Sequence, residues 1–198
     1  MHFTTNEIFK ALSKEFSGLN QKDIEDFLRI TTYKIADKNK IILRSGVYNK
    51  KVILILKGTV RGYIIDEKGN EITILIRSNG IFVADTGTLF TDNPQRMAFK
   101  SIDESHILIF NYKDFDLLAN QNPKIMQLHL FALKEAVTRL FYRIESLTTM
   151  PPEERYKDII ALNPDFMKST SAKYLANYLG ITPQSLSRII KRIKDGKS

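Results

Sequence analysis

The sequence predicts an α+β fold, in which short β-strands lie between helical segments. Two observations predict it. From about residue 31 to residue 111, short runs rich in Ile, Val and aromatic residues are separated by turn residues at roughly ten-residue intervals. On both sides of that region, apolar residues recur at the three- and four-residue spacing of amphipathic helices.

The strand region contains a series of apolar runs, each bounded by residues that favour turns. The runs are Tyr33–Ile35, Lys40–Leu43, Val52–Leu56, Val60–Ile65, Ile72–Ile76, Met97–Ile102 and Ile107–Phe110. Gly69-Asn70 separates two neighbouring runs and predicts a hairpin. Short strands at such regular spacing are typical of an antiparallel barrel or sandwich.

Helices are expected before and after the strands. Residues 4–30 predict two short helices, and residues 113–120 predict a third. A long helix is then expected from Pro123 to Leu147, because Pro is favoured in the first turn of a helix and Pro151-Pro152 ends it. Residues 153–162 predict one more short helix.

The long helix carries an apolar seam whose members are spaced alternately four and three residues apart. The seam consists of Met126, Leu130, Leu133, Val137, Leu140, Ile144 and Leu147. Such a seam predicts packing against another helix. A core helix within one domain is the alternative interpretation of the same spacing.

Composition limits the classes of function. The chain has 30 Lys and Arg against 22 Asp and Glu, a formal net charge of +8, which favours a polyanionic partner. Because there is no cysteine, disulfides, thiolate-held iron–sulfur clusters and cysteine nucleophiles are excluded. The N-terminus lacks the pattern of a signal peptide, and no apolar run reaches the ~18 residues of a membrane span. We therefore expect a cytoplasmic protein without membrane contact.

The last segment has the pattern of a helix-turn-helix. Ser171 is suited to cap a first helix, Gly180 to supply a left-handed turn, and Thr182-Pro183 to begin a second helix. Apolar residues recur through both predicted helices and would form their shared core. We expect DNA contacts from Ser171, Thr182, Gln184, Ser185, Ser187, Arg188, Lys191 and Arg192.

These side chains suit the major groove of DNA. Arg can donate two hydrogen bonds to guanine, Gln can bind adenine, and Ser and Lys can reach phosphates. A solvated basic face on an ordinary helical hairpin is the alternative. Because the sequence ends at Ser198, we expect no β-hairpin wing after the second helix.

Two stretches carry a resemblance to a known family. The run Leu56–Tyr63, followed by Asp66–Glu71, resembles the β-roll of the Crp/Fnr transcription regulators. The order of β-roll, long helix and helical module matches that family over nearly the whole chain. The resemblance implies a sensor β-roll at 1–122, a dimerisation helix at 123–149 and a helix-turn-helix domain at 150–198. It also implies that the apolar seam is a dimer interface in which two seams pair in parallel. An inverted-repeat operator in double-stranded DNA and RNA polymerase are the further partners that it implies.

The resemblance also locates an effector site. In the members that bind cyclic nucleotides, a Gly-Glu-Leu segment and an Arg-Ser pair surround the cyclic phosphate and ribose. Here the matching residues are Ala84-Asp85-Thr86 and Arg96-Met97. Because Met97 cannot donate a hydrogen bond to phosphate, we expect that cyclic AMP is not the effector.

The effector site is therefore assigned to Asp85, Thr86, Arg96 and Met97, for an effector that the sequence does not identify. The alternative is that Asp85 and Arg96 pair with each other at the surface of the roll.

Enzymatic classes have little support in the sequence. His2, His106 and His129 are far apart, so a metal-dependent enzyme on a cupin-like barrel lacks its ligand cluster. No catalytic constellation is visible, and we expect neither an enzyme nor a cofactor. The sequence thus predicts a homodimeric, sequence-specific DNA-binding transcription regulator. The alternative function is a ligand-sensing or protein-interaction module that does not bind DNA.

Overall fold

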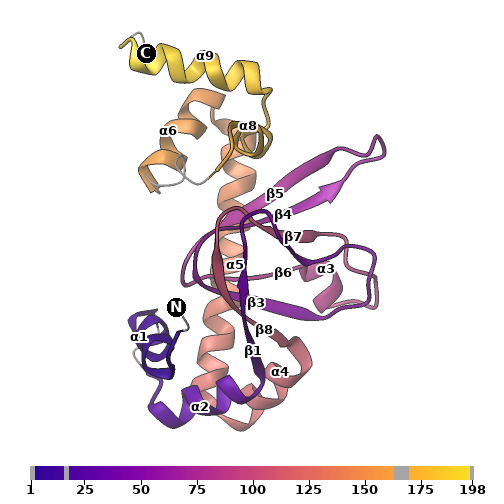
Figure 1. The fold of residues 1–198 in the computed structure, drawn as a ribbon, viewed down its shortest axis with the longest axis vertical. Helices are drawn as coiled ribbons and strands as arrows, with labels where there is room; N and C mark the ends of the chain where they lie inside the picture. Colours follow the sequence, from indigo (N-terminus) through magenta and orange to yellow (C-terminus); the bar gives the residue numbers. More distant parts are fainter. Residues whose placement is uncertain (1–2, 16–17, 163–169, 197–198) are drawn as a thin grey trace.

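The computed structural model describes residues 3–15, 18–162 and 170–196. One long helix runs along the molecule (Figure 1). A β-roll and the N-terminal helices pack along most of its length, and a small helical module lies at its C-terminal end.

The β-roll consists of two four-stranded antiparallel sheets, with strand orders β1-β8-β3-β6 and β2-β7-β4-β5. The strands are β1 (Thr31–Ala36), β2 (Ile41–Leu43), β3 (Lys51–Lys57), β4 (Val60–Ile65), β5 (Glu71–Arg77), β6 (Phe82–Ala84), β7 (Ala98–Ser101) and β8 (Ser105–Asn111). The predicted antiparallel roll is confirmed, as is the hairpin between β4 and β5.

Strand β3 explains the longest apolar run of the roll. Ile53 and Ile55 point between the two sheets, where they pack with Val60 and Phe99. Its alternate residues belong to a second core beneath the helices. Because both faces of the strand are covered, it is apolar throughout instead of alternating with polar residues.

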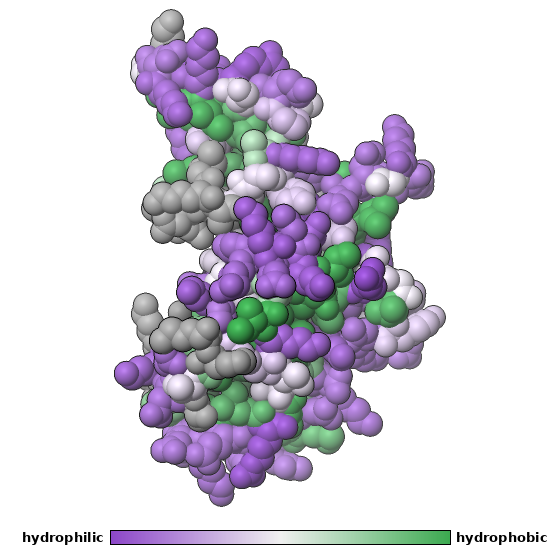
Figure 2. Space-filling view, in the orientation of Figure 1, coloured by the Kyte–Doolittle hydropathy of each residue, from purple (hydrophilic) through white to green (hydrophobic). Residues whose placement is uncertain are grey.

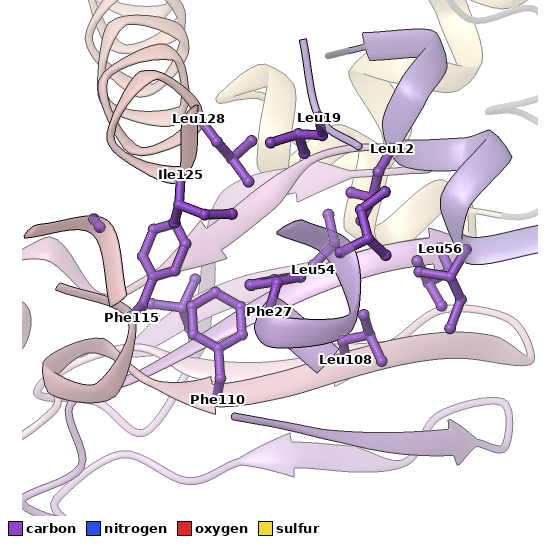
Figure 3. Packing of buried hydrophobic residues seen from close by; sticks show 14 of the residues in the cluster. Leu12, Leu19, Phe27, Leu54, Leu56, Leu108, Phe110, Phe115, Ile125 and Leu128 are labelled. Atoms are coloured by element: carbon purple, nitrogen blue, oxygen red, sulfur yellow. The ribbon is translucent and has the colours of Figure 1, made fainter. Parts of the chain in front are cut away.

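Three helices cover the outer face of the first sheet. They are α1 (Thr5–Glu15), α2 (Gln21–Arg29) and α4 (Tyr112–Gln121), close to the ranges predicted. Figure 3 shows Phe27, Phe110 and Phe115 packed together in this core, with Ile125 and Leu128 reaching in from the long helix. The aromatic cluster thereby joins the helices to the sheet.

The long helix α5 (Pro123–Thr149) is buried in its first turns, at Ile125, Leu128 and His129, and again at Ser146 near its C-terminal end. The Asn122 side chain caps it by accepting a hydrogen bond from the Lys124 amide at 2.9 Å. Farther along, the apolar seam is open to solvent in the single chain. Leu130, Val137, Leu140 and Ile144 are 49%, 52%, 59% and 51% exposed.

Strand β6 and the short helix α3 (Thr86–Leu89) were not predicted from the sequence. The strand has only three residues, and it forms by pairing with Val52–Leu54 of β3. The helix has four residues and depends on a cap from Asp85. Segments this short have no periodicity from which to infer them.

The C-terminal module contains α6 (Pro152–Leu162), α8 (Ala172–Leu179) and α9 (Pro183–Lys194), as predicted. Its core includes Leu175, Leu179 and Leu186, and two roll residues, Ile76 and Ile102, pack into the same cluster. The module is therefore packed against the roll. Among the helices described, none is long and apolar enough to cross a membrane.

Candidate nucleic-acid interface and sensor cavity

The helix-turn-helix forms through the local signals that its sequence carries. The Ser171 hydroxyl accepts a hydrogen bond from the Tyr174 amide at 3.3 Å, which caps α8. Gly180 has a φ of 72°, so the chain turns in the left-handed conformation that glycine favours. Thr182 caps α9 by accepting from the Ser185 amide at 3.1 Å, and Pro183 follows as the first helical residue. The predicted caps and turn are confirmed.

The polar face of α9 points away from the rest of the protein. Leu186 and Ile189 are buried against α8, whereas Gln184, Arg188 and Lys191 are exposed. Helix α9 lies at the end of the molecule farthest from the N-terminal helices (Figure 1), and Figure 2 shows a largely hydrophilic surface at this end.

Several of the predicted DNA-binding residues are already engaged within the protein. Ser171 and Thr182 act as caps, and the Thr182 hydroxyl also donates to Ser185 Oγ at 3.0 Å. Arg192 forms an ion pair with Glu153 of α6, with Nη2 and Oε2 2.7 Å apart. Arg192 therefore connects α9 to α6, although its side chain is 52% exposed. Gln184, Ser187, Arg188 and Lys191 are also exposed, and Arg188 Nη2 donates to Ser185 Oγ at 3.3 Å.

In the predicted effector site, the carboxylate of Asp85 binds backbone amides of the protein itself. Asp85 is buried, and its Oδ2 accepts hydrogen bonds from the amides of Arg96 at 2.6 Å and Met97 at 2.8 Å. Its Oδ1 accepts from the Gly87 amide at 3.1 Å. Three backbone donors are thus already occupied.

The expected pair of Asp85 and Arg96 side chains at the roll surface is wrong. Asp85 is buried and bonds to the backbone of Arg96. The guanidinium of Arg96 is exposed and has no ion pair within the described residues. The reason is physical: a short carboxylate at the start of α3 can satisfy several amides that would otherwise lack acceptors.

A cavity of about 380 Å³ lies between the roll and α5. Its wall is largely apolar and aromatic, and includes Phe82, Phe110 and Phe115. Arg77 and Arg139 also line it, and Arg139 is paired with Glu135 at 2.8 Å. Of the predicted effector residues, Thr86 and Met97 line this cavity, whereas Asp85 and Arg96 do not. Sequence reasoning missed its aromatic wall, because those residues come from separate strands and helices.

The two described histidines are held separately by tyrosines. His106 Nδ1 lies 2.5 Å from the Tyr33 hydroxyl, and His129 Nε2 lies 3.2 Å from the Tyr112 hydroxyl. His2 lies outside the described residues. Across residues 3–15, 18–162 and 170–196, no group of three or more His, Cys, Asp or Glu side chains could hold a metal ion.

The buried position of His129 predicts a pH dependence of stability. Burial lowers the pKa of His129, although Asp116 opposes the shift. The unfolded chain therefore binds this proton at a higher pH, near 6.5, and stability is lost as the pH falls below that value. Urea unfolding at pH 7.5 and pH 5.5 should show a smaller difference for His129→Phe than for the wild type. Equal differences for both proteins would contradict the assignment.

Comparison with known proteins gives matches to part and to most of the chain. The family model for the cyclic nucleotide-binding domain matches residues 34–122. The regulatory protein HlyX from Actinobacillus pleuropneumoniae is 24% identical over 173 residues, which cover 81% of this chain and 71% of that protein.

Solved structures share the fold of most of this chain. FixK2 from Bradyrhizobium japonicum matches with a TM-score of 0.68 and 15% identity, over 84% of this chain and 86% of that chain. The c-di-GMP responsive global regulator CLP of Xanthomonas campestris also gives a TM-score of 0.68, at 15% identity over 89% of this chain and 93% of its own. A chain from Eubacterium rectale, described as a transcriptional regulator of the Crp/Fnr family, gives 0.68 at 13% identity over 91% and 86%.

Residues 34–122 thus match the cyclic nucleotide-binding domain family, and most of the chain has the fold of the Crp/Fnr regulators. The resemblance seen in the sequence is confirmed.

Proposed function

We propose that the protein is a homodimeric, sequence-specific DNA-binding transcription regulator of the Crp/Fnr type. Residues 1–122 form its sensor domain, residues 123–149 its dimerisation helix, and residues 150–198 its DNA-binding domain. The observation that carries the proposal is the capped helix α9, whose outer face presents Gln184, Arg188 and Lys191. RNA polymerase is a further proposed partner, and DNA as partner implies a cytoplasmic location. A binding role instead of catalysis agrees with the name of HlyX, a regulatory protein.

The apolar seam of α5 supports dimerisation. A row of half-exposed leucine, valine and isoleucine side chains on one helix is costly in water unless another surface covers it. Two copies of the seam, packed in parallel, would cover each other. Such a dimer presents two α9 helices, so its operator is an inverted repeat with half-site centres about 34 Å apart.

The sensor is proposed to respond to a small effector other than cyclic AMP. The Asp85 carboxylate occupies the amides of Gly87, Arg96 and Met97, so these donors are not available to a phosphate. A second anion beside this carboxylate would also be repelled. The neighbouring cavity, with its aromatic wall, favours a ligand with more apolar surface than a sugar phosphate.

Calorimetry tests the exclusion of cyclic AMP. We expect no measurable heat of binding when cyclic AMP is titrated into the wild-type protein, because the Asp85 carboxylate already occupies the backbone donors of the site. Tight binding that Arg96→Ala abolishes would contradict the exclusion. Lys100→Ala is a matched control, since it removes a half-buried cation from the nearby strand β7.

Selection of bound sequences from random duplex DNA tests the proposed function itself. We expect an inverted repeat to be enriched, and its binding to weaken as salt is raised. Equal, weak binding to every duplex without salt dependence would instead favour the protein-interaction module. Repeating the selection with a pool of metabolites tests whether an effector changes the affinity.

A further inference from the structure

A buried arginine connects the roll to the DNA-binding domain. Arg61 of β4 is only 1% exposed. Its guanidinium carbon lies 4.3 Å from the centre of the Tyr63 ring and 3.8 Å from the centre of the Tyr174 ring. Because Tyr63 belongs to the roll and Tyr174 to α8, the cation lies between aromatic rings of the two domains.

Polar contacts complete the connection. Arg61 Nη2 pairs with Glu71, and Nη1 donates to Thr73 Oγ1 at 3.4 Å. The Thr73 amide donates in turn to the side-chain oxygen of Asn177 on α8. We call these six residues, Arg61, Tyr63, Glu71, Thr73, Tyr174 and Asn177, the Arg61 joint.

The chemistry of the Arg61 joint fixes the orientation of α8 relative to the roll more than it adds to the stability of their contact. The ion pair of Arg61 with Glu71 adds little net stability, because the buried Arg61 charge loses its hydration while the Glu71 side chain is 37% exposed and stays hydrated. A planar guanidinium that stacks between two rings, however, restricts where those rings can lie relative to each other. The apolar contact beside the joint would hold the domains together without the same directional constraint, since hydrophobic contact is non-directional.

A second arginine holds α8 from the side of the long helix. The Arg143 guanidinium carbon lies 4.0 Å from the centre of the Tyr178 ring, and Nη2 donates to the Tyr178 carbonyl. Helix α8 is therefore fixed both to the roll and to α5.

Fixing α8 also fixes α9, because the two helices share a core that includes Leu175, Leu179 and Leu186. The exposed face of α9, with Gln184 and Arg188, is not part of the joint. The joined arrangement therefore leaves the DNA-binding face open.

We propose that Arg61 is a positioning residue for DNA binding, and that it sets the direction in which α9 is presented to the operator. This inference rests on the proposed function. A dimer binds an inverted repeat only when both α9 helices lie at the separation of the half-sites. If each DNA-binding domain moved freely, only a fraction of the molecules would have the correct arrangement. The apparent affinity would then equal the intrinsic affinity multiplied by that fraction.

The experiment compares Arg61→Ala with the wild type on the selected operator, on the same operator with two base pairs inserted between half-sites, and on random duplex. We expect Arg61→Ala to weaken operator binding by about tenfold or more, as for a competent fraction near one in ten. The insertion should cost the wild type more affinity than it costs the variant. This loss of spacing preference is a result that general destabilisation would not give.

Matched variants separate the joint from folding and from charge. Lys68→Ala removes a cation from the exposed tip of the same hairpin and should bind as the wild type does. Arg61→Lys keeps a cation beside Glu71 but loses the planar stack, and should fall between wild type and Arg61→Ala. Tyr174→Leu alters the joint from the α8 side and should reproduce the relaxed spacing even if Arg61→Ala folds poorly.

The proposal is overturned if the operator affinity and spacing preference of Arg61→Ala and Tyr174→Leu both match those of the wild type. It is also overturned if the wild type binds no duplex specifically. Of these outcomes, only the absence of specific binding by the wild type contradicts the proposed function as well. Limited proteolysis of the free proteins, with faster cleavage near Met150 expected for Arg61→Ala, tells the two failures apart. Unchanged cleavage would show that Arg61 does not hold the domains.

Discussion

Replacing Leu133 and Leu140 together with Asp is expected to convert the protein from a dimer to a monomer. Leu140 is 59% exposed in the single chain, and both residues lie on the apolar seam of α5. A dimer would contain four of these leucines, and each contributes about 1.5 kcal/mol or more when buried. Their loss should weaken association by at least about four orders of magnitude, before the cost of burying carboxylates is added.

Sedimentation at micromolar concentration measures this result directly. Thr138→Asp is the control, because Thr138 is exposed on α5 outside the seam and the variant adds a carboxylate without entering the interface. We expect this control to remain a dimer. A wild-type protein that sediments as a monomer at micromolar concentration would contradict the assignment of the seam.

The second large effect is expected at Arg188, which lies one turn beyond Gln184 on the exposed face of α9. Loss of a bidentate contact to a base should cost about 1–3 kcal/mol and relax the preference at one base pair. Arg188→Ala should therefore weaken binding to the operator more than binding to random duplex.

Lys191→Ala is the matched variant for Arg188→Ala, since it removes a cation farther along the same helix. We expect Lys191 to contact phosphate, so its loss should weaken all sequences alike and lower the salt slope by about one unit. Titrations of operator and random duplex at several salt concentrations separate the two roles. The roles are reversed if Arg188→Ala weakens both duplexes equally while Lys191→Ala affects the operator alone.

Arg192 is expected to behave differently from both. Because it is paired with Glu153 at 2.7 Å, Arg192→Ala removes a contact between α9 and α6 as well as a positive charge. The structure therefore adds a contact within the protein to the DNA contact that the sequence predicted for this residue.

Local patterns were sufficient to predict most of the elements. Turn residues around Gly69-Asn70 predicted the β4–β5 hairpin, and Ser171, Gly180 and Thr182 predicted the helix-turn-helix. These signals work because caps and turns depend on residues close together in the chain.

What the sequence did not predict depends on contacts between distant residues. Asp85 binds the amides of Arg96 and Met97, eleven and twelve residues away, and no local spacing indicates this. Arg61 meets Tyr174 across more than half of the chain, and β6 exists only because β3 accepts it as a partner. Such contacts follow from the packing of the whole molecule.

The central claim is that two copies of this chain bind one inverted repeat through paired α9 helices. The most direct measurement is the stoichiometry and footprint of the wild-type protein on its selected duplex. We expect two protomers per duplex, with protected half-sites centred about 34 Å apart, roughly one helical turn. One protomer per duplex, or a single protected half-site, would contradict the claim.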